Sequence, residues 1–439
     1  MAPDDNRPTH GLTSPADLPP TEPTADQRRA RPVDAPRRSG LASAVDILKM
    51  RDFQFLLLGN AMMFAGFQVR NMGQAWLVLE LTDSSLWVGI VNAMPGIAII
   101  SISLLGGAIS DRAERWKIQV VTRFVIASMA FVTAFLVTSG VVQAWHLIPI
   151  GLTTGSMFAF HNPASQAFAM DIVGRERLMN AVSLNTTLSQ TATVAGPMLG
   201  GYLLATGLDS AFYLLGVLYG VGFLTMLAMK TRSTPVRSEN RSIVREIRDG
   251  VRYAAGNSTI KWLLFMSAGG LFTGIFQAVT PLYARNILDV GEVGYGTMVT
   301  VQGIGTLVGS FALVLHGEVK HKAVLIFGAM LLLNTAMTLF SFSTYYPLSL
   351  GMLFLMGIGF GVWFITTPTL IQTRTDEHMR GRVMSIFFMI ALIFQLGWIL
   401  GGVLDTLIGT QGATLVAAAG SMTIVVIAFA SSRDLRHLT

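Results

Sequence analysis

Arg70 stands inside a long apolar run of the sequence, and three further side chains surround it at helical spacing: Phe67, Asn71 and Gln74. On an α-helix these four side chains share one face. A guanidinium presents a planar set of N–H donors that matches a carboxylate, and a charge within an apolar segment is costly unless it has a function. We therefore expect this face to bind a small molecule, and to favour an anionic or carboxylate-bearing one.

Two alternatives for Arg70 remain open at this point. Its long side chain could extend to the edge of the apolar segment and keep its charged head in water. It could also form an ion pair with Glu80, which follows on the same segment, or with the distant Asp405. In either case Arg70 would have a structural role.

Further polar residues are candidates for binding the same small molecule or for carrying a proton. Asn162, which precedes Pro163, and Gln277, which a shift of 207 residues places opposite Arg70, are candidate substrate-binding residues. Proton coupling requires a titratable carboxylate, and the apolar runs of the first half contain no Asp or Glu near their centres. Glu80, toward the end of its run, is therefore the candidate for proton coupling.

The composition defines the class of protein. Of 439 residues, 52% are hydrophobic and only 13% are charged, against about 25% charged in soluble domains. The mean hydropathy is +0.56. The absence of cysteine excludes disulfides and thiolate metal sites, and the sequence contains no GxxxxGK[ST] phosphate-binding loop. We expect a polytopic membrane protein that is not an enzyme and has no cofactor, no metal and no catalytic residues.

Twelve apolar segments are long enough to cross a bilayer, which takes about 20 helical residues. The expected fold is therefore an all-α membrane protein with twelve transmembrane helices. The expected spans are 53–79, 86–109, 118–139, 145–169, 180–206, 210–230, 259–283, 293–316, 321–343, 346–370, 382–408 and 411–432.

The chain divides into two halves of six spans each. The shift of 207 residues aligns Gly89 with Gly296 and Gly96 with Gly303, which indicates parallel repeats with a binding site between them. The expected organisation is a disordered cytoplasmic tail (1–45), a first bundle (46–230), a linker with an amphipathic helix (231–258), a second bundle (259–432) and a cytoplasmic tail (433–439).

The distribution of basic residues predicts the orientation. Arginine and lysine gather in the loops on the side shared by the N-terminus, whereas the loops of the other side contain only Arg285. By the positive-inside rule both termini and the linker are cytoplasmic. This distribution also accounts for the net charge of +6 without nucleic-acid binding.

The stretch GGAISDRAERWK (106–117) places a compact charge cluster between two apolar runs. Its pattern G-x-x-x-D-R-x-x-R resembles the loop between spans 2 and 3 of the major facilitator superfamily. The stretches 73–91, 162–185 and 376–389 resemble the bacterial efflux branch that includes the enterobactin exporter, and "AGPMLGG" in span 5 resembles the antiporter motif of exporting members. The resemblance covers most of residues 50–430 and implies the major facilitator fold, with two pseudo-symmetric six-helix bundles.

The resemblance also implies a gate. In this family the aspartate of the loop docks on the start of span 11 when the inner side is closed, and a carboxylate there gains from the helix dipole. The glycines and the proline of the motifs permit close packing or bending. The residues expected to take part are Gly107, Asp111, Arg112, Arg115, Gly196, Pro197, Arg380 and Arg382.

The expected function is export of a small amphipathic molecule, drug- or siderophore-like, by alternating access and proton antiport. The resemblance implies a monomer in the bacterial plasma (inner) membrane, whose partners are its substrate, protons and the lipid bilayer. Two alternatives stay within the fold, a lysophospholipid flippase and an uptake porter. A third belongs to another class, a membrane receptor or scaffold that transports nothing.

Overall fold

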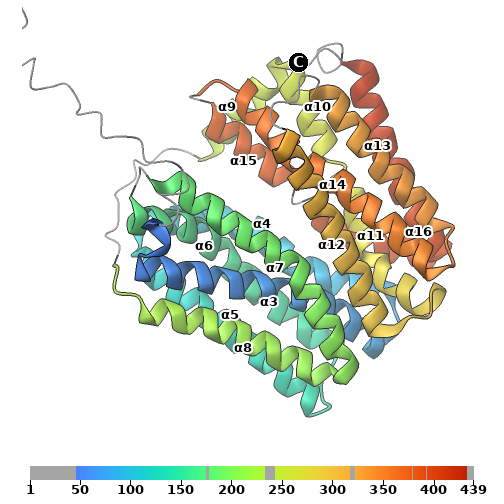
Figure 1. Ribbon diagram of the computed structural model, residues 1–439, viewed down its shortest axis with the longest axis horizontal. Coiled ribbons are helices and arrows are strands. Elements are labelled where there is room, and N and C mark those ends of the chain that lie inside the picture. The colour runs from blue at the N-terminus through green and yellow to red at the C-terminus, as the bar shows by residue number, and fades with distance from the viewer. Residues whose placement is uncertain are drawn as a thin grey trace, which may run out of the picture.

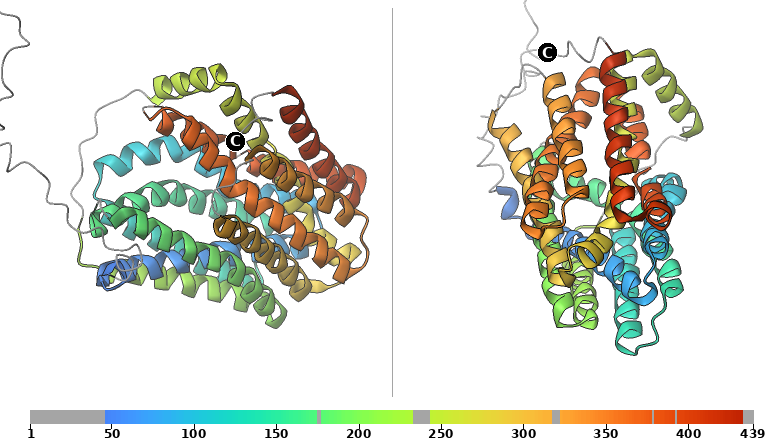
Figure 2. Two further views of the ribbon diagram at one scale, coloured as in Figure 1. Left: turned by 45° about the horizontal axis from the view of Figure 1, so that its top comes forward. Right: turned by 90° about the vertical axis from the view of Figure 1, so that its right-hand side faces the viewer.

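The computed structural model is all-helical in the part of the chain that it describes, which comprises residues 46–174, 177–232, 243–316, 322–377, 379–391 and 393–432. The expected tails, 1–45 and 433–439, lie outside these residues. The helices form two separate bundles, one from each half of the chain (Figure 1). The same two groups remain distinct in the two further views (Figure 2).

The first bundle contains six long helices, which together with one short 3₁₀ turn (η2, Ala144–His146) follow one another through short connections. The first of them ends where Asp83 adopts a left-handed conformation and its backbone N–H donates to the carbonyl of Leu79 at 2.8 Å, a common helix stop. The six are α3 (Arg51–Thr82), α4 (Ser85–Arg112), α5 (Arg115–Thr138), α6 (Leu147–Val173), α7 (Leu178–Thr206) and α8 (Leu208–Ala228).

The second bundle also has six membrane-crossing units, and helix α9 (Ile243–Gly256) precedes it. Two of the units consist of two helices each: α10 and α11 are separated at residues 268–269, and α15 ends at Ala391 before α16 begins at Phe394. The remaining bounds are α10 (Ser258–Ser267), α11 (Gly270–Leu282), the π-helical turn η4 (Tyr283–Ile287), α12 (Gly291–His316), α13 (Lys322–Ser341), α14 (Tyr346–Arg374), α15 (Arg380–Ala391) and α16 (Phe394–Ser431).

Helix α16 contains two crossings joined at Gly409. The backbone there has φ 75° and ψ 168°, a conformation that only glycine adopts readily. The chain therefore turns at this residue between the eleventh and twelfth expected spans. The two helices follow each other directly on either side of this non-helical residue.

Eight stretches of the described residues are both long and apolar enough to cross a membrane. Seven of them account for one crossing each, and the stretch in α16 accounts for two, which gives nine. Helices α3, α6 and α7 supply the other three but fall outside that set. They contain polar residues such as Arg70, His161 and Asn185, which lower their mean hydropathy. The expected twelve-helix fold class is confirmed.

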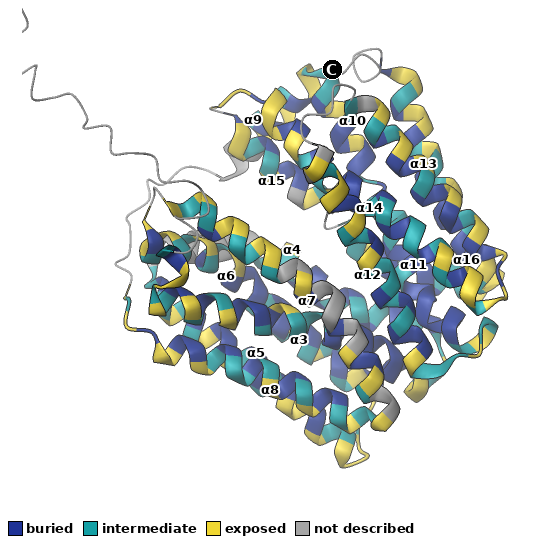
Figure 3. Ribbon diagram, in the orientation of Figure 1, coloured by how far each residue is buried: buried dark blue, intermediate teal, exposed yellow. Residues whose placement is uncertain are grey.

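Apolar side chains cover the outside of both bundles, where lipid would surround a membrane protein. Leu315, Phe135 and Leu407 are 84%, 66% and 73% exposed, and they lie on three different helices. Buried segments gather inside each bundle and where the bundles meet (Figure 3). This arrangement is that of a multi-pass membrane protein.

The bundles meet at one end, which we call the closed end: the end with the α3–α4 connection and the start of α12. Here Gly89 of α4 packs against the backbone of Trp398, and Gly402 of α16 packs against that of Ser85. The Ser85 hydroxyl donates to the Gly402 carbonyl at 3.2 Å. The ribbons diverge toward the opposite end, where α9 and α15 lie (Figure 1). We call this the open end.

We predict that Gly409→Ala destabilises the protein by about 1–3 kcal/mol, because alanine is strained at this backbone conformation. Thermal unfolding of the purified protein in detergent measures the effect. The control is Gly351→Ala in α14, where an added Cβ meets nothing within 4 Å and the backbone is helical. Equal melting temperatures for the two variants would contradict the assigned turn.

Candidate functional site

Arg70 is the centre of a polar group on α3. Its side chain is buried, its Nη2 donates to Asn71 Oδ1 at 2.7 Å, and its Nη1 lies 3.5 Å from Gln74 Oε1. The guanidinium carbon lies 5.2 Å from the centre of the Phe67 ring. The structure thus brings together the four α3 residues that helical spacing placed on one face. We call Phe67, Arg70, Asn71 and Gln74 the α3 group.

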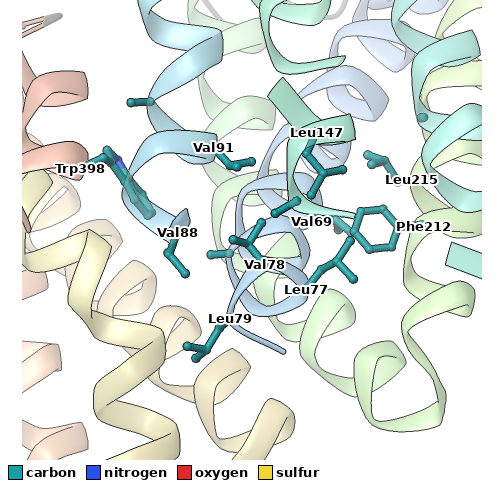
Figure 4. Packing of buried hydrophobic residues seen from close by; sticks show 14 of the residues in the cluster. Val69, Leu77, Val78, Leu79, Val88, Val91, Leu147, Phe212, Leu215 and Trp398 are labelled. Atoms are coloured by element: carbon teal, nitrogen blue, oxygen red, sulfur yellow. The ribbon is translucent and has the colours of Figure 1, made fainter. Parts of the chain in front are cut away.

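Neighbouring helices hold this group in position. Gln74 Nε2 donates to the carbonyl of Val91 on α4 at 3.3 Å, and the Phe67 ring meets that of Phe158 on α6 edge-on, with the centroids 5.7 Å apart. Figure 4 shows part of the apolar cluster that contains Val69 of α3 and Val91 of α4, together with residues of five other helices. The group is therefore fixed by the core of the first bundle.

Tyr219 of α8 belongs to the same site, and sequence reasoning missed it. Its ring packs against Gly66 of α3, and its hydroxyl lies beside the Arg70 guanidinium. Neither this hydroxyl oxygen nor Arg70 Nε makes a hydrogen bond with any residue that the structure describes. No sequence signal pointed to Tyr219, because a single tyrosine in an apolar run is common and its neighbour is 149 residues away.

A second buried arginine, Arg123 of α5, was also missed. It is 0% exposed and binds only neutral oxygen atoms. A lone arginine inside an expected span is the same signal that identified Arg70, and it could have identified Arg123. Its acceptors are Asn60 Oδ1 at 2.7 Å, the Gly222 carbonyl at 2.8 Å, Gln119 Oε1 at 3.3 Å and Thr225 Oγ1 at 3.5 Å.

The Arg123 site continues through Asn60 to other helices. Asn60 Nδ2 donates to Asn185 Oδ1 of α7 at 3.0 Å, and Gln119 Nε2 donates to the carbonyl of His161 on α6 at 2.8 Å. Polar side chains therefore join α3, α5, α6, α7 and α8 inside the first bundle.

Three other expected site residues lie apart from the α3 group. Asn162 is exposed on α6, and Gln277 is half-buried on α11. Neither forms a hydrogen bond or ion pair with the α3 group. Glu80 is exposed near the end of α3 at the closed end. Arg70 makes no ion pair with Glu80, with Asp405 or with any other carboxylate of the described residues, and its burial excludes a water-exposed head group.

The open end contains the residues expected to form the gate. Gly107, Asp111 and Arg112 lie in the last turns of α4, and their side chains lie outside the described part of the chain, so the expected contact of Asp111 with α15 stays a prediction. Arg115 forms an ion pair with Asp171 of α6 at 2.6 Å, within the same bundle.

On the opposite bundle, the expected partners of Asp111 have other contacts. Arg380 Nε donates to the Gln372 carbonyl at 3.1 Å, and Arg382 Nη1 lies 3.7 Å from Asp249 on helix α9. Tyr253 of α9 accepts a hydrogen bond at its hydroxyl from the Asp376 backbone N–H at 3.1 Å. Helix α9 is therefore attached to the start of α15.

The span 5 motif contributes to packing inside the first bundle. Gly196 of α7 lies against Gln68 and the Ala65 carbonyl of α3, so a larger residue would separate these helices. Pro197 follows in the same helix, but its side chain lies outside the described residues.

The start of α3 is tied to the segment that follows α8. The carboxylate of Asp52 accepts hydrogen bonds from the backbone N–H of Thr231 at 2.7 Å and of Lys230 at 3.2 Å, and from the Thr231 hydroxyl. The first and last helices of the first bundle are thereby joined at the open end.

At the closed end an ion pair crosses between the bundles. Arg285, which follows α11, lies 3.3 Å from Asp83 and donates to the Leu79 carbonyl at 3.3 Å, so it binds the end of α3. Nearby, the rings of Trp76 and Tyr295 stack across the interface with centroids 5.9 Å apart. We call this pair of contacts the closed-end latch.

The fold matches solved transporters closely. A transporter of the POT family in complex with a thioalcohol-conjugated peptide aligns with a TM-score of 0.70 at 12% identity, over 90% of this chain and 100% of that one. The nucleoside transporter NupG gives 0.69 at 13% identity, over 86% and 98%. A bacterial homologue of the lysosomal transporter Spinster, in an inward-facing, occupied conformation, gives 0.69 at 13%, over 88% and 97%. The fold is that of a major facilitator transporter.

The family can be stated more narrowly. Residues 42–437 match the family described as "Transmembrane secretion effector", and the chain belongs to this family of major facilitator transporters. It is a multi-pass membrane protein with bacterial relatives, it transports a small molecule, and it is not an enzyme.

Three relatives illustrate the range of the family. The multidrug efflux pump Tap of Mycolicibacterium fortuitum is 24% identical over 83% of this chain and 91% of its own length. The enterobactin exporter EntS of Shigella boydii serotype 18 is 26% identical over 69% and 73%. The staphyloferrin A transporter of Staphylococcus aureus is 21% identical over 87% and 97%.

We predict that Arg285→Gln loosens the closed end. The ion pair is exposed, and such pairs are worth about 1 kcal/mol at most, so the bundles should part up to about fivefold more often. Spin labels on cysteines introduced at Leu81 and Val293, both exposed at the closed end, report the separation, and the chain has no native cysteine.

Asp83→Asn should give the same change, because it removes the other charge of the pair. Lys322→Gln, at the start of α13, is the control and should leave the distance distribution unchanged. If both latch variants match the unsubstituted protein, the ion pair has no part in closing this end.

Proposed function

We propose that the protein exports a small amphipathic molecule, drug- or siderophore-like, from the bacterial cytoplasm by alternating access. One observation carries the proposal: the bundles make close backbone contacts at the closed end, as at Gly89 and Gly402, and diverge at the other. The Tap and EntS relatives, an efflux pump and an exporter, support this direction of transport.

The proposed cycle consists of rocking between the two bundles. With both termini in the cytoplasm, as the positive-inside rule expects, the open end faces inward and the conformation is inward-facing. The α3 group lies about 12 residues, or roughly 18 Å, from the closed end of its helix, and we propose that it forms part of the substrate site. Asn162 and Gln277 are proposed to reach the substrate when the bundles close around it.

The return to the outward-facing state requires the open end to close. We propose that Asp111 then binds the start of α15, in a gate that includes Gly107, Arg112, Arg115, Arg380 and Arg382. Arg382 would exchange its contact with Asp249 for one with Asp111. Gly196 and Pro197 of α7 would keep the first bundle rigid while it moves.

Proton antiport is the proposed driving process. Glu80 lies exposed at the closed end, which faces the outside in this orientation, so protons from outside would reach it directly. We therefore propose Glu80 as an entry point for protons. The experiment is export by vesicles with and without a collapsed proton gradient; export that is insensitive to the gradient would contradict the antiport.

We predict that Asp111→Asn lowers the rate of export about tenfold, because a gating contact worth about 1.4 kcal/mol shifts the two states by that factor. Flux is measured as the accumulation of externally added fluorescent amphipathic compounds in inside-out vesicles that contain ATP-free buffer and carry a proton gradient. Glu114→Gln, in the same loop, is the control and should export normally. Wild-type vesicles that move no compound, or an Asp111→Asn variant with full flux, would favour the scaffold alternative.

A further inference from the structure

The two buried arginines of the first bundle differ in how many of their guanidinium nitrogen atoms donate hydrogen bonds to the protein. Arg123 is enclosed by four oxygen acceptors on three helices, and each of its three nitrogen atoms donates to at least one. Since buried polar groups are nearly always hydrogen-bonded, Arg123 is a complete structural site. It needs no further partner.

Arg70, in contrast, lacks a full set of hydrogen-bond acceptors. Its Nε has no acceptor, its Nη1 contact with Gln74 is long at 3.5 Å, and only the 2.7 Å bond to Asn71 is short. The adjacent Tyr219 hydroxyl also has no hydrogen-bond partner among the described residues. Two unpartnered donors therefore lie side by side, whereas the other unpartnered buried atom described in the first bundle, His161 Nδ1, belongs to α6.

No carboxylate among the described residues forms an ion pair with Arg70. In the membrane-crossing helices every carboxylate lies close to a helix end or to the turn at Gly409. A buried charge is costly unless it is paired and hydrogen-bonded. Every nitrogen atom of Arg123 has an oxygen acceptor, whereas Arg70 has neither a carboxylate partner nor a full set of acceptors. The acidic residues concerned are Asp52, Glu80, Asp111, Asp171, Asp209, Glu292 and Asp405.

We propose that the transported molecule carries an anionic oxygen group, a carboxylate or similar oxyanion, that accepts hydrogen bonds from Arg70 Nε and the Tyr219 hydroxyl. The inference rests on the proposed transport function and names its substrate class. Phe67 and Phe158, whose rings meet edge-on beside Arg70, provide an apolar surface for the rest of the molecule. Tyr219 is thus a specificity-determining residue.

A consequence for energy coupling follows. A substrate that binds as an anion carries its negative charge outward, and an inside-negative membrane potential favours that movement. Exchange for an entering proton adds a second charge in the same electrical direction. Transport of the anionic substrate is therefore more sensitive to the membrane potential than transport of a neutral analogue.

The test compares three fluorescent probes with one ring system: pyrenebutyrate, its neutral amide and the corresponding amine. Binding to the purified protein is measured by energy transfer from its tryptophans, and export is measured in vesicles. Wild type should bind pyrenebutyrate at least tenfold more tightly than the amide or the amine. A membrane potential should accelerate export of pyrenebutyrate more than that of the amide.

Three variants locate the selectivity. Arg70→Gln should remove the preference for pyrenebutyrate, and Tyr219→Phe should reduce it severalfold. Arg51→Gln, an identical change at the exposed start of the same helix, should leave it intact. Arg70→Lys serves if Arg70→Gln fails to fold, because it keeps the charge, loses the Nε donor and should retain a weakened preference.

Each outcome separates the inference from the export function. Equal binding of pyrenebutyrate and its amide by wild type, or an unchanged preference in a folded Arg70→Gln variant, overturns the inference while export can stand. Selective binding that Arg70→Gln abolishes, without export of any probe, supports the inference and contradicts the export function. Binding of none of the probes contradicts the anion site.

Discussion

Close backbone contact between the two bundles is the interaction on which the rest of the structure depends. In lipid there is no strong hydrophobic drive for helices to associate, and small residues allow the backbones to approach. Gly89 and Gly402 place α4 and α16 in contact in this way, and Gly201 of α7 meets Gly296 of α12. Because these contacts are at one end, the two bundles diverge toward the other, and a site within the first bundle lies between a closed and an open end.

The interior of the first bundle follows a second constraint, the cost of burying charge. Arg123 meets that cost with neutral oxygen atoms from three helices, and in doing so it cross-links them. Arg70 lies on the face shared with Asn71 and Gln74 and retains an unused donor. One arginine thus stabilises the bundle, and the other is the one that we propose binds a ligand with its own negative charge.

Apolar periodicity was sufficient to predict the membrane-crossing helices, because a helix in lipid must be apolar over nearly its whole length. The observed α5 (115–138) and α12 (291–316), for example, differ by at most three residues from the expected 118–139 and 293–316. The interruption of the seventh span at residues 268–269 was not predicted, since neighbouring helices determine where a glycine-containing segment breaks.

The site was predictable only where its residues are close in sequence. The α3 group came from the spacing of residues 67 to 74 on one helix. Tyr219, by contrast, reaches Arg70 through the packing of α8 on Gly66, and the contact of Arg382 with Asp249 depends on where α9 settles. Such contacts between distant segments are set by tertiary packing, which neither hydropathy nor motif spacing encodes.

The ties at the open end of the first bundle constrain how the molecule can move. Asp52 holds the beginning of α3 to the residues after α8, and Arg115 holds α5 to Asp171 of α6. Because the first bundle is held together at both places, we expect its helices to stay together and the two bundles to move relative to each other about the glycine contacts. We therefore expect the transporter to change state by rigid-body rotation of the two bundles about these contacts, with little bending inside the first bundle.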